Sequence, residues 1–281
     1  MQKNKVKQSQ PSSDVISHVS LRSNAKINLA LDVLGIEKIG KFRGYHLIQT
    51  IIQEITPQNT AGFVPDVIMI EAKKAKKNTI KVCTCRPQDQ SEITIPPREN
   101  AAHKAAELML KFAKSKYSIK ITIQKNIPLS SGLGGGASNA AAVIKGLNHM
   151  LKSNLSTQKT RELAKQISMD TPFFITGGIA LAEHFGEIIT PLPPVKGLAF
   201  VVTTPEIRPL TNKTKSQYAK INLKKCGQNI GKTTALLHAI KTSDPLAIHP
   251  LLHNDFETLL KSSLSKNHHL SGAGPSYFIL A

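Results

Sequence analysis

The chain has 281 residues, of which 40% are hydrophobic, and its 37 Lys and Arg against 18 Asp and Glu give a formal net charge of +19. No apolar run approaches the roughly 18 residues that span a bilayer, and the N-terminal residues lack the apolar block of a secretory signal. Three cysteines exclude a disulfide framework. These properties predict a cytoplasmic protein of two lobes or one large domain, with no membrane contact.

The excess of positive charge favours an anionic partner of some kind. It is concentrated in residues 73–77 and in residues 207–232, which contain seven Lys or Arg and no acid. Aromatic residues make up only 5% of the chain, so the stacking platforms of single-strand binders are missing. We therefore interpret both segments as solvated loops, and nucleic-acid binding is not expected.

The N-terminal third predicts a tail followed by strands. Residues 1–18 are polar and predict a disordered tail. Residues 25–35 alternate between apolar and polar side chains, which predicts a half-buried strand. Its apolar face would carry Ile27, Leu29, Leu31 and Val33, and its polar face Lys26, Asn28 and Asp32. Lys26 and Asn28 should therefore point the same way.

The rest of the chain alternates between strand and helix patterns. Strands are predicted at 47–55, 66–72, 78–84, 117–125 and 197–205, with a strand pair in 177–193. Helices are predicted from Asn100 onward, with Ala101, Ala105, Leu108 and Phe112 on one stripe, and also at 140–151 and 156–167. The second of these helices has Ser138 or Asn139 available as its N-cap. The proline-rich residues 191–197 mark a plausible boundary between lobes.

A glycine-rich loop joins the strand at 117–125 to the helix that follows. Four of the five residues from Gly132 to Gly136 are glycine, more than a tight turn requires. Such a loop presents free backbone N–H groups and the positive end of a helix dipole. The loop is therefore predicted to bind phosphate.

Three other known patterns fit poorly. The dinucleotide fingerprint at Gly132, Gly134 and Ala137 lacks its acid, because no Asp or Glu occurs between Glu107 and Glu162. Residues 226–233 end like a nucleotide-binding loop but start with Cys and are interpreted as a loop before a helix. Residues 249–257 place two histidines four apart, but Pro250 stands where a zinc protease needs Glu. A helix start with surface histidines is expected there, and no metal ligand is assigned.

The pattern from Pro128, P-x-x-x-GLGGG-A-S-N-A-A, resembles the second motif of the GHMP small-molecule kinases. Four more segments resemble that family in the same order: AKIN with a later GYH, MDTPFF with a following GE, HNDFE, and LSGAGPSYF. The likeness is strongest to the branch whose acceptor is methylerythritol carrying a cytidine diphosphate. It covers the chain from about residue 25 to its end.

The resemblance implies an α+β, two-lobed GHMP kinase fold. It implies a ribosomal-S5-like N-terminal lobe that binds ATP, here residues 19–193, and a smaller α/β C-terminal lobe, residues 194–281. The active site would lie in the cleft between the lobes. The reaction implied is transfer of the γ-phosphate of ATP, with Mg²⁺, to the 2-hydroxyl of the acceptor. Both a monomer and a homodimer stay open.

The resemblance also implies residue roles. Asp170 matches the catalytic base and Lys26 the lysine that pairs with it. Tyr45 and His46 fall where the family holds the cytidine ring, Asn28 lies on the substrate side, and Gly272 and Gly274 of the third motif also face the substrate. The implied ATP-binding set is Asn100, Pro128, Ser131, Gly132, Leu133, Gly134, Gly135, Gly136, Ala137 and Ser138.

Several positions depart from the family pattern. Ser130 and Ser131 replace small glycine-rich residues, Ala137 replaces Ser, Arg43 replaces Asp, and His184 replaces Gly. The sequence ends soon after the third motif, which suggests reduced stability. Two alternatives stay open: a GHMP kinase with another alcohol acceptor, and a homologue that binds nucleotide with little or no turnover.

Overall fold

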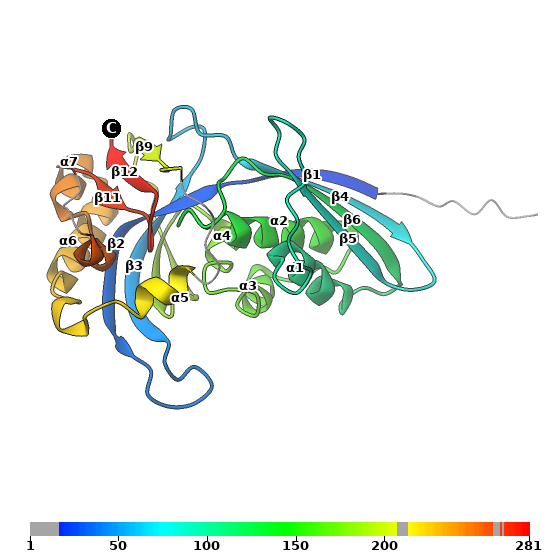
Figure 1. The fold of residues 1–281 in the computed structure, drawn as a ribbon, viewed down its shortest axis with the longest axis horizontal. Helices are drawn as coiled ribbons and strands as arrows, with labels where there is room; N and C mark the ends of the chain where they lie inside the picture. Colours follow the sequence, from blue (N-terminus) through cyan, green and yellow to red (C-terminus); the bar gives the residue numbers. More distant parts are fainter. Residues whose placement is uncertain (1–16, 207–212, 261–264, 266) are drawn as a thin grey trace, which may run out of the picture.

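The computed structural model describes residues 17–206, 213–260, 265 and 267–281 and contains three β-sheets (Figure 1). None of the described helices combines the length and the apolar character needed to cross a bilayer. Most of the predicted N-terminal tail, residues 1–16, lies outside the described residues. Its last two residues, Ser17 and His18, belong to strand β1, so this part of the tail prediction was wrong.

A four-stranded sheet occupies one end of the molecule, with strand order β1-β4-β6-β5. Its strands are β1 (Ser17–Ser23), β4 (Asp66–Lys74), β5 (Thr79–Cys85) and β6 (Tyr117–Gln124). Helices α1 (Ala101–Leu110) and α2 (Gly135–Met150) cover one face of this sheet, and α3 (Thr157–Ala164) lies beside them (Figure 1). Isoleucines of β4 and β6 and the alanine-rich faces of α1 and α2 form the core between these layers.

A five-stranded sheet occupies the middle of the molecule, with order β10-β2-β3-β7-β8. Its strands are β2 (Ala25–Ile36), β3 (His46–Ile55), β7 (Ile179–His184), β8 (Ile188–Leu192) and β10 (His253–Asn254). The predicted strand pair in 177–193 is confirmed as β7 and β8. β10 comes from the C-terminal part of the chain and pairs in parallel with β2, so the two ends of the sequence share this sheet.

Strand β2 is buried on both faces from Ala25 to Val33, which corrects the prediction of a half-buried strand. A register shift between Asn28 and Ala30 breaks the alternation. Beyond it, Leu31 and Val33 join a different hydrophobic cluster from Ile27 and Leu29. The predicted common apolar face is therefore split in two, because one extra residue in a bulge reverses the side-chain alternation.

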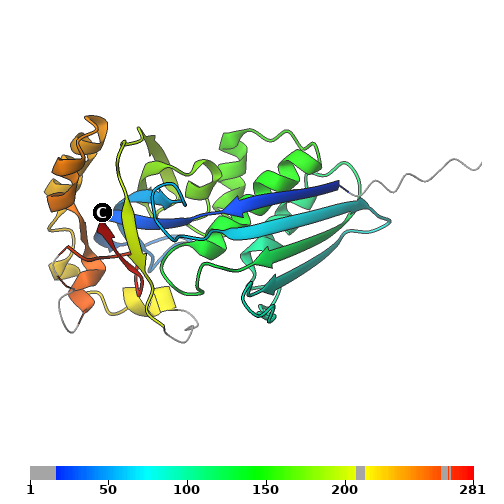
Figure 2. The ribbon, with the colours of Figure 1, turned by 90° about the horizontal axis from the view of Figure 1, so that it is seen from above.

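The C-terminal residues form a three-stranded sheet, β11-β12-β9, and short helices (Figure 2). The strands are β9 (Phe200–Thr203), β11 (His269–Leu270) and β12 (Tyr277–Leu280). The helical elements of this part are α5 (Lys213–Tyr218), η1 (Leu223–Lys225), α6 (Ile230–Lys241), α7 (Pro245–Ile248), η2 (His249–Leu251) and η3 (Asp255–Leu259), whereas the short helix α4 (Phe173–Thr176) packs against α2 and α3. A single hydrophobic cluster joins α6 and β12 to β2, so the core continues across the predicted lobe boundary.

Two local predictions for the helices were wrong. The buried face of α1 carries Ala102, Ala105 and Met109, whereas Phe112 is exposed, because alanines at neighbouring positions made two stripes equally plausible. Helix α2 begins at Gly135 with Gly134 as its N-cap, so Ser138 lies inside the helix. The loop interpretation of residues 226–233 is confirmed, since α6 begins within it at Ile230.

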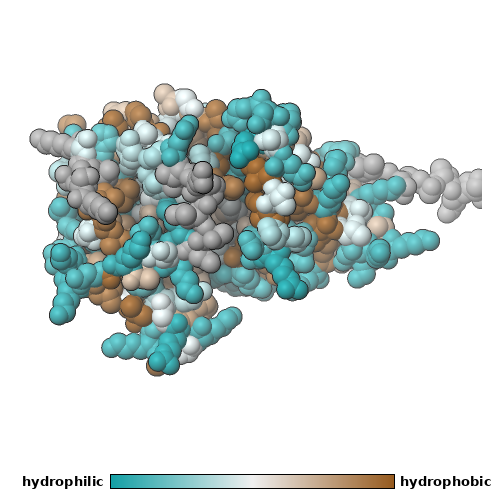
Figure 3. Space-filling model, in the orientation of Figure 1, coloured by the Kyte–Doolittle hydropathy of each residue, from teal (hydrophilic) through white to brown (hydrophobic). Residues whose placement is uncertain are grey.

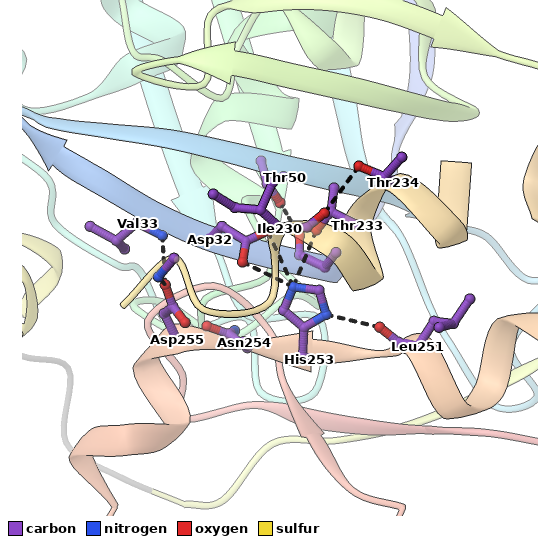
Figure 4. Close-up of polar contacts among 12 residues, drawn as sticks. Asp32, Val33, Thr50, Ile230, Thr233, Thr234, Leu251, His253, Asn254 and Asp255 are labelled. Carbon is purple, nitrogen blue, oxygen red and sulfur yellow. Dashed lines mark hydrogen bonds and ion pairs between the residues drawn. The ribbon is translucent and has the colours of Figure 1, made fainter. Parts of the chain in front are cut away.

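A buried polar network ties the C-terminal part of the chain to β2 (Figure 4). The Asp32 carboxylate accepts a hydrogen bond of 2.5 Å from the Thr233 hydroxyl of α6. It also lies 3.2 Å from Nε2 of His253. The Asp255 carboxylate accepts from the backbone N–H groups of Val33 and Gly227, at 2.7 and 2.8 Å. His253 is 5% exposed, so the prediction of surface histidines was wrong for it.

The His253–Asp32 contact predicts a pH-dependent stability. Burial alone lowers the pKa of His253, but hydrogen bonds to Asp32 and Leu251 and the charges of Asp32 and Asp255 outweigh burial and raise the pKa. A raised folded-state pKa stabilises the fold below the unfolded pKa of about 6.5, and this contribution is lost as pH rises through the folded pKa.

The melting temperature should therefore fall as pH is raised from about 6 into the mildly alkaline range. His253→Gln should flatten this dependence, whereas His238→Gln, at an exposed position on α6, should keep it. Scanning calorimetry across the range measures both variants. Equal pH dependence in the wild type and in His253→Gln would show that this network does not set the stability.

Candidate active site

The glycine loop and the start of α2 form the first part of the site. Gly132 and Gly134 have φ angles of +87° and +72°, values that favour glycine. Gly134 caps α2 without any side-chain hydrogen bond, which leaves the first backbone N–H groups of the helix without a side-chain acceptor. Leu133 between them is buried, and its carbonyl accepts from the Lys26 N–H at 2.9 Å. The loop is thus attached to β2 and presents an anion-binding helix terminus.

A buried ion pair holds the chain where it enters the loop. Asp66 accepts from the ammonium of Lys125 and from the backbone N–H groups of Asn126 and Ile127, the latter two at 2.7 and 2.8 Å. A Cβ added at Gly135 would lie 2.8 Å from the Lys125 amine. Sequence analysis missed this pair, because its two residues are 59 positions apart.

The third motif packs directly on the glycine loop. The Ser271 hydroxyl donates to the carbonyls of Lys26 and Gly132, at 3.2 and 3.0 Å. The Ser276 N–H donates to the Ser131 carbonyl at 3.0 Å. A Cβ at Gly132 would lie 2.3 Å from the Ser271 carbonyl oxygen, so only glycine allows this approach. The glycine loop and the third motif thus form one wall of the site, although Gly132 and Ser271 are 139 positions apart in the sequence.

Lys26 and Asn28 lie on the same side of β2, as predicted. The Lys26 ammonium donates to Oδ1 of Asn28 at 2.7 Å, and this oxygen also accepts from the Gly272 N–H at 2.8 Å. Burial lowers the pKa of Lys26, and the negative charge of Asp170 partly offsets this effect. The structure therefore brings Lys26 and Asp170 into electrostatic contact, with the third motif beside them.

Asp170 lies in a short turn between α3 and α4. The Ser168 and Thr171 hydroxyls are 2.7 Å apart in this turn, and Thr171 is fully buried. Phe173 and Phe174 anchor the following helix in the core, and the Phe174 ring would lie 3.0 Å from a Cβ at Gly134. The segment that carries Asp170 is thus packed against the glycine loop.

Of the predicted pair, Tyr45 directly precedes β3 and His46 is its first residue, but the two rings have different neighbours. The Tyr45 ring is 49% exposed and contacts Phe42 and Phe185, with centroids 5.4 and 5.5 Å apart. The His46 ring lies 4.6 Å from the ring of Tyr218. Successive residues of an extended chain point in opposite directions, which explains the separation.

Tyr218 is an aromatic residue of the site that sequence analysis missed. Burial and the charge of Asp170 raise its pKa, which places it near the predicted base as well as near His46. It lies within the basic segment 207–232, which we interpreted as a solvated loop; residues 207–212 of that segment are outside the described residues. The sequence feature that could have indicated Tyr218 as a binding residue is its place as an aromatic residue among lysines.

A cleft of about 1120 Å³ is lined by residues of the β2–β3 loop, the glycine loop, the segment just before Asp170, α5 and the third motif. Four lysines line it, and the described lining residues include no carboxylate. The lysines are Lys41, Lys165, Lys213 and Lys215. Lys41 belongs to the loop between β2 and β3, whose tip projects from the molecule and carries hydrophilic side chains (Figures 1 and 3). The cleft therefore has the positive charge expected of a site for polyphosphates.

Some predicted binding residues use their side chains within the fold. Oδ1 of Asn100 caps α1 by accepting from the backbone N–H groups of Ala102 and His103. The Ser138 hydroxyl accepts from Ser23 at 2.7 Å and is buried. His184, which departs from the Gly of the resembled pattern, has a φ angle of +67°, a conformation that glycine adopts more readily. Oδ1 of Asn100 and the oxygen of the Ser138 hydroxyl are therefore already hydrogen-bonded within the fold.

Comparison with known proteins identifies the family of this chain. Residues 100–178 match the family model described as GHMP kinases N terminal domain. The chain is 34% identical over 253 residues to 4-diphosphocytidyl-2-C-methyl-D-erythritol kinase of Alkaliphilus metalliredigens (strain QYMF), covering 90% of this chain and 78% of the relative. The protein of the same name from Caldicellulosiruptor saccharolyticus (strain ATCC 43494 / DSM 8903 / Tp8T 6331) is 34% identical over 272 residues, covering 92% and 86%.

Solved structures agree with this assignment. The crystal structure of a 4-(cytidine 5'-diphospho)-2C-methyl-D-erythritol kinase matches with a TM-score of 0.66 at 25% identity, covering 94% of this chain and 90% of that chain. The mevalonate kinase of Methanococcus jannaschii matches with a TM-score of 0.61 at 15% identity, covering 96% and 92%, and shares the fold. The predicted α+β GHMP kinase fold is confirmed. The chain belongs to the 4-diphosphocytidyl-2-C-methyl-D-erythritol kinase family of the GHMP kinases.

Proposed function

We propose that this protein transfers the γ-phosphate of ATP to the 2-hydroxyl of 4-diphosphocytidyl-2-C-methyl-D-erythritol, giving the 2-phosphate and ADP. This reaction belongs to the methylerythritol phosphate route to isoprenoid precursors. The observation that carries the proposal is that the glycine loop and the third motif line one lysine-rich cleft, while Lys26 lies against the third motif in electrostatic contact with Asp170. The enzyme would act in the cytoplasm as a monomer or homodimer, without binding membrane or nucleic acid.

Phosphoryl transfer needs positioning and charge more than covalent chemistry from the protein. We propose that the Asp170 carboxylate accepts the proton of the acceptor hydroxyl as its oxygen attacks the γ-phosphorus. Lys26 would offset the negative charge that develops on the transferred group. Because burial lowers the pKa of Lys26 and Asp170 raises it, the charged form of this lysine depends on its partner.

The cytosine ring would bind at the aromatic residues at the start of β3 and the end of α5. Tyr45 lines the cleft, and its exposed face is available for stacking. His46 has a pKa lowered by burial, so the neutral ring can exchange hydrogen bonds with a base edge. Tyr218, beside His46, would close this end of the site.

Mg²⁺ would be bound mainly through the phosphate oxygens of ATP. Among the described residues there is no group of three or more His, Cys, Asp or Glu side chains that could hold a metal ion. This arrangement fits a cation that keeps its water ligands and uses one or two carboxylates with substrate phosphates. Asp170, which is in electrostatic contact with Lys26 and follows the cleft-lining residue Met169, would supply the carboxylate, and a bound ion would neutralise charge on the phosphates.

The decisive experiment measures ADP release by the purified protein with Mg-ATP, with and without 4-diphosphocytidyl-2-C-methyl-D-erythritol, and follows the product by phosphorus NMR. We expect ADP release that depends on the acceptor, together with a new phosphomonoester signal. ATP binding without turnover would favour a different acceptor or a weakened homologue.

Tyr45→Ala should raise the KM for the cytidyl acceptor more than the KM for ATP. Base–aromatic stacking contributes about 1–3 kcal/mol, so an increase of roughly 5- to 150-fold is expected. Steady-state kinetics with each substrate varied measures both constants. Phe112→Ala, at an exposed aromatic residue after α1, is the matched control and should change neither. Equal increases in both constants for Tyr45→Ala would show that the cytosine pocket lies elsewhere.

A further inference from the structure

Lys213, the first residue of α5, connects the two loops that border the cleft. Its ammonium donates a hydrogen bond of 3.0 Å to the carbonyl of Ser130, at the start of the glycine loop. It also donates to the carbonyl of Gly274 in the third motif. Lys213 thus directs a charge of the basic segment, in its described part, at the glycine loop.

The charge of Lys213 has no acidic partner among the described residues. It forms no ion pair there, and both of its hydrogen-bond acceptors are neutral carbonyls. The titratable groups that face the same cleft are Lys41, Lys165 and Lys215. Lys26 on β2 also acts on it electrostatically. A cation held only by carbonyls and surrounded by other cations gains from an anionic ligand.

We propose that Lys213 is a further phosphate-binding residue, whose ammonium binds an oxygen of the ATP phosphate chain at the glycine loop. This inference rests on the proposed function, because it assumes that the loop holds the donor nucleotide. A charge-assisted bond to a phosphate oxygen is stronger than a bond to a neutral carbonyl. The phosphate would therefore compete successfully for the amine.

The position of Lys213 on α5 favours the donor rather than the acceptor. Tyr218, at the other end of this helix, lies at the proposed cytosine site. The five residue steps from Lys213 to Tyr218 span about 7.5 Å along the helix, so the two ends serve different parts of the site. Ser130 lies two positions before Gly132, and the ammonium of Lys213 reaches its carbonyl. Lys213 therefore lies at the end of the site that is formed by the glycine loop.

This role predicts a pH dependence of ATP binding. Burial and the charge of Lys26 lower the pKa of Lys213 to about 8. The ammonium is charged below this pH and loses its charge above it, so the affinity for ATP should fall as pH rises through about 8. Arginine keeps its charge over this range, and a Lys213→Arg variant should therefore lose the dependence.

The test compares Lys213→Met and Lys213→Arg with the wild type, and Lys220→Met serves as the control at an exposed lysine just after α5. ATP dissociation constants are measured by calorimetry, and both KM values by kinetics, at about pH 7 and about pH 9. Lys213→Met should weaken ATP binding about 10- to 100-fold at the lower pH, with little change in the acceptor KM. Lys213→Arg should restore binding and remove the pH dependence, and Lys220→Met should match the wild type.

Unchanged ATP binding by Lys213→Met, a rise confined to the acceptor KM, or wild-type pH dependence in Lys213→Arg would overturn the inference. Because calorimetry reports ATP binding without turnover, the outcome does not depend on the acceptor being correct. A wild-type protein that binds ATP but does not phosphorylate the cytidyl acceptor would overturn the proposed function alone. Melting temperatures of the variants verify that each is folded.

Discussion

Asp170→Asn should lower kcat by about 10²- to 10⁴-fold while ATP binding persists, because the variant keeps the shape of the side chain and loses the proton acceptor. The turn that carries Asp170 is held by the Ser168 and Thr171 hydroxyls and by buried Phe173, so it should keep its conformation. Loss of the carboxylate also removes the charge that raises the pKa of Lys26. Without that charge Lys26 would lose its proton more easily, and this would lower kcat further.

Single-turnover kinetics and calorimetric titration with ATP measure the two parts of this prediction. Asp89→Asn, at an exposed carboxylate in the loop after β5, is a matched control and should have wild-type kinetics. Unimpaired turnover by Asp170→Asn would exclude Asp170 from proton transfer. Loss of both turnover and ATP binding would indicate that Asp170 holds the site together instead.

Gly132→Ala should lower kcat/KM by about 10²-fold or more, since misplacement by about 1 Å has an effect of this size. A Cβ at this position would lie 2.3 Å from the Ser271 carbonyl oxygen and 2.7 Å from that of Gly274. Both are backbone atoms, so the third motif would have to move away from the glycine loop. The φ angle of +87° adds strain, and a loss of about 1–3 kcal/mol in the free energy of unfolding is expected.

Gly231→Ala is the control for this substitution. Gly231 lies in α6 with no heavy atom within 4 Å of an added Cβ. Alanine in a helix should stabilise the protein by up to about 1 kcal/mol and leave kinetics unchanged. Chemical denaturation and steady-state kinetics measure both variants. Wild-type activity in Gly132→Ala, or lost activity in Gly231→Ala, would contradict the assignment of the phosphate loop to residues 132–136.

The sequence specified the glycine loop because its signal is local. Positive φ angles at Gly132 and Gly134 and a helix that starts at Gly135 follow from residues that are neighbours in the chain. The shared side of Lys26 and Asn28 was likewise predictable, because the strand alternates regularly up to the bulge. The residue roles came from the resemblance to GHMP kinases, and they stay predictions until the variants are measured.

The sequence by itself therefore determined the family, the position of the glycine-rich loop before a helix, and most of the strands and helices. Only the tertiary structure decided which distant groups share the cleft and which side chains are buried. It placed His46 against Tyr218, Asp32 against His253, and Lys213 between Ser130 and Gly274. The residues of each pair are separated by more than 60 positions in the sequence, and hydrophobic periodicity carries no information on contacts at that distance. Long-range packing sets them, because burial of the shared core fixes how the C-terminal strands and helices lie on β2.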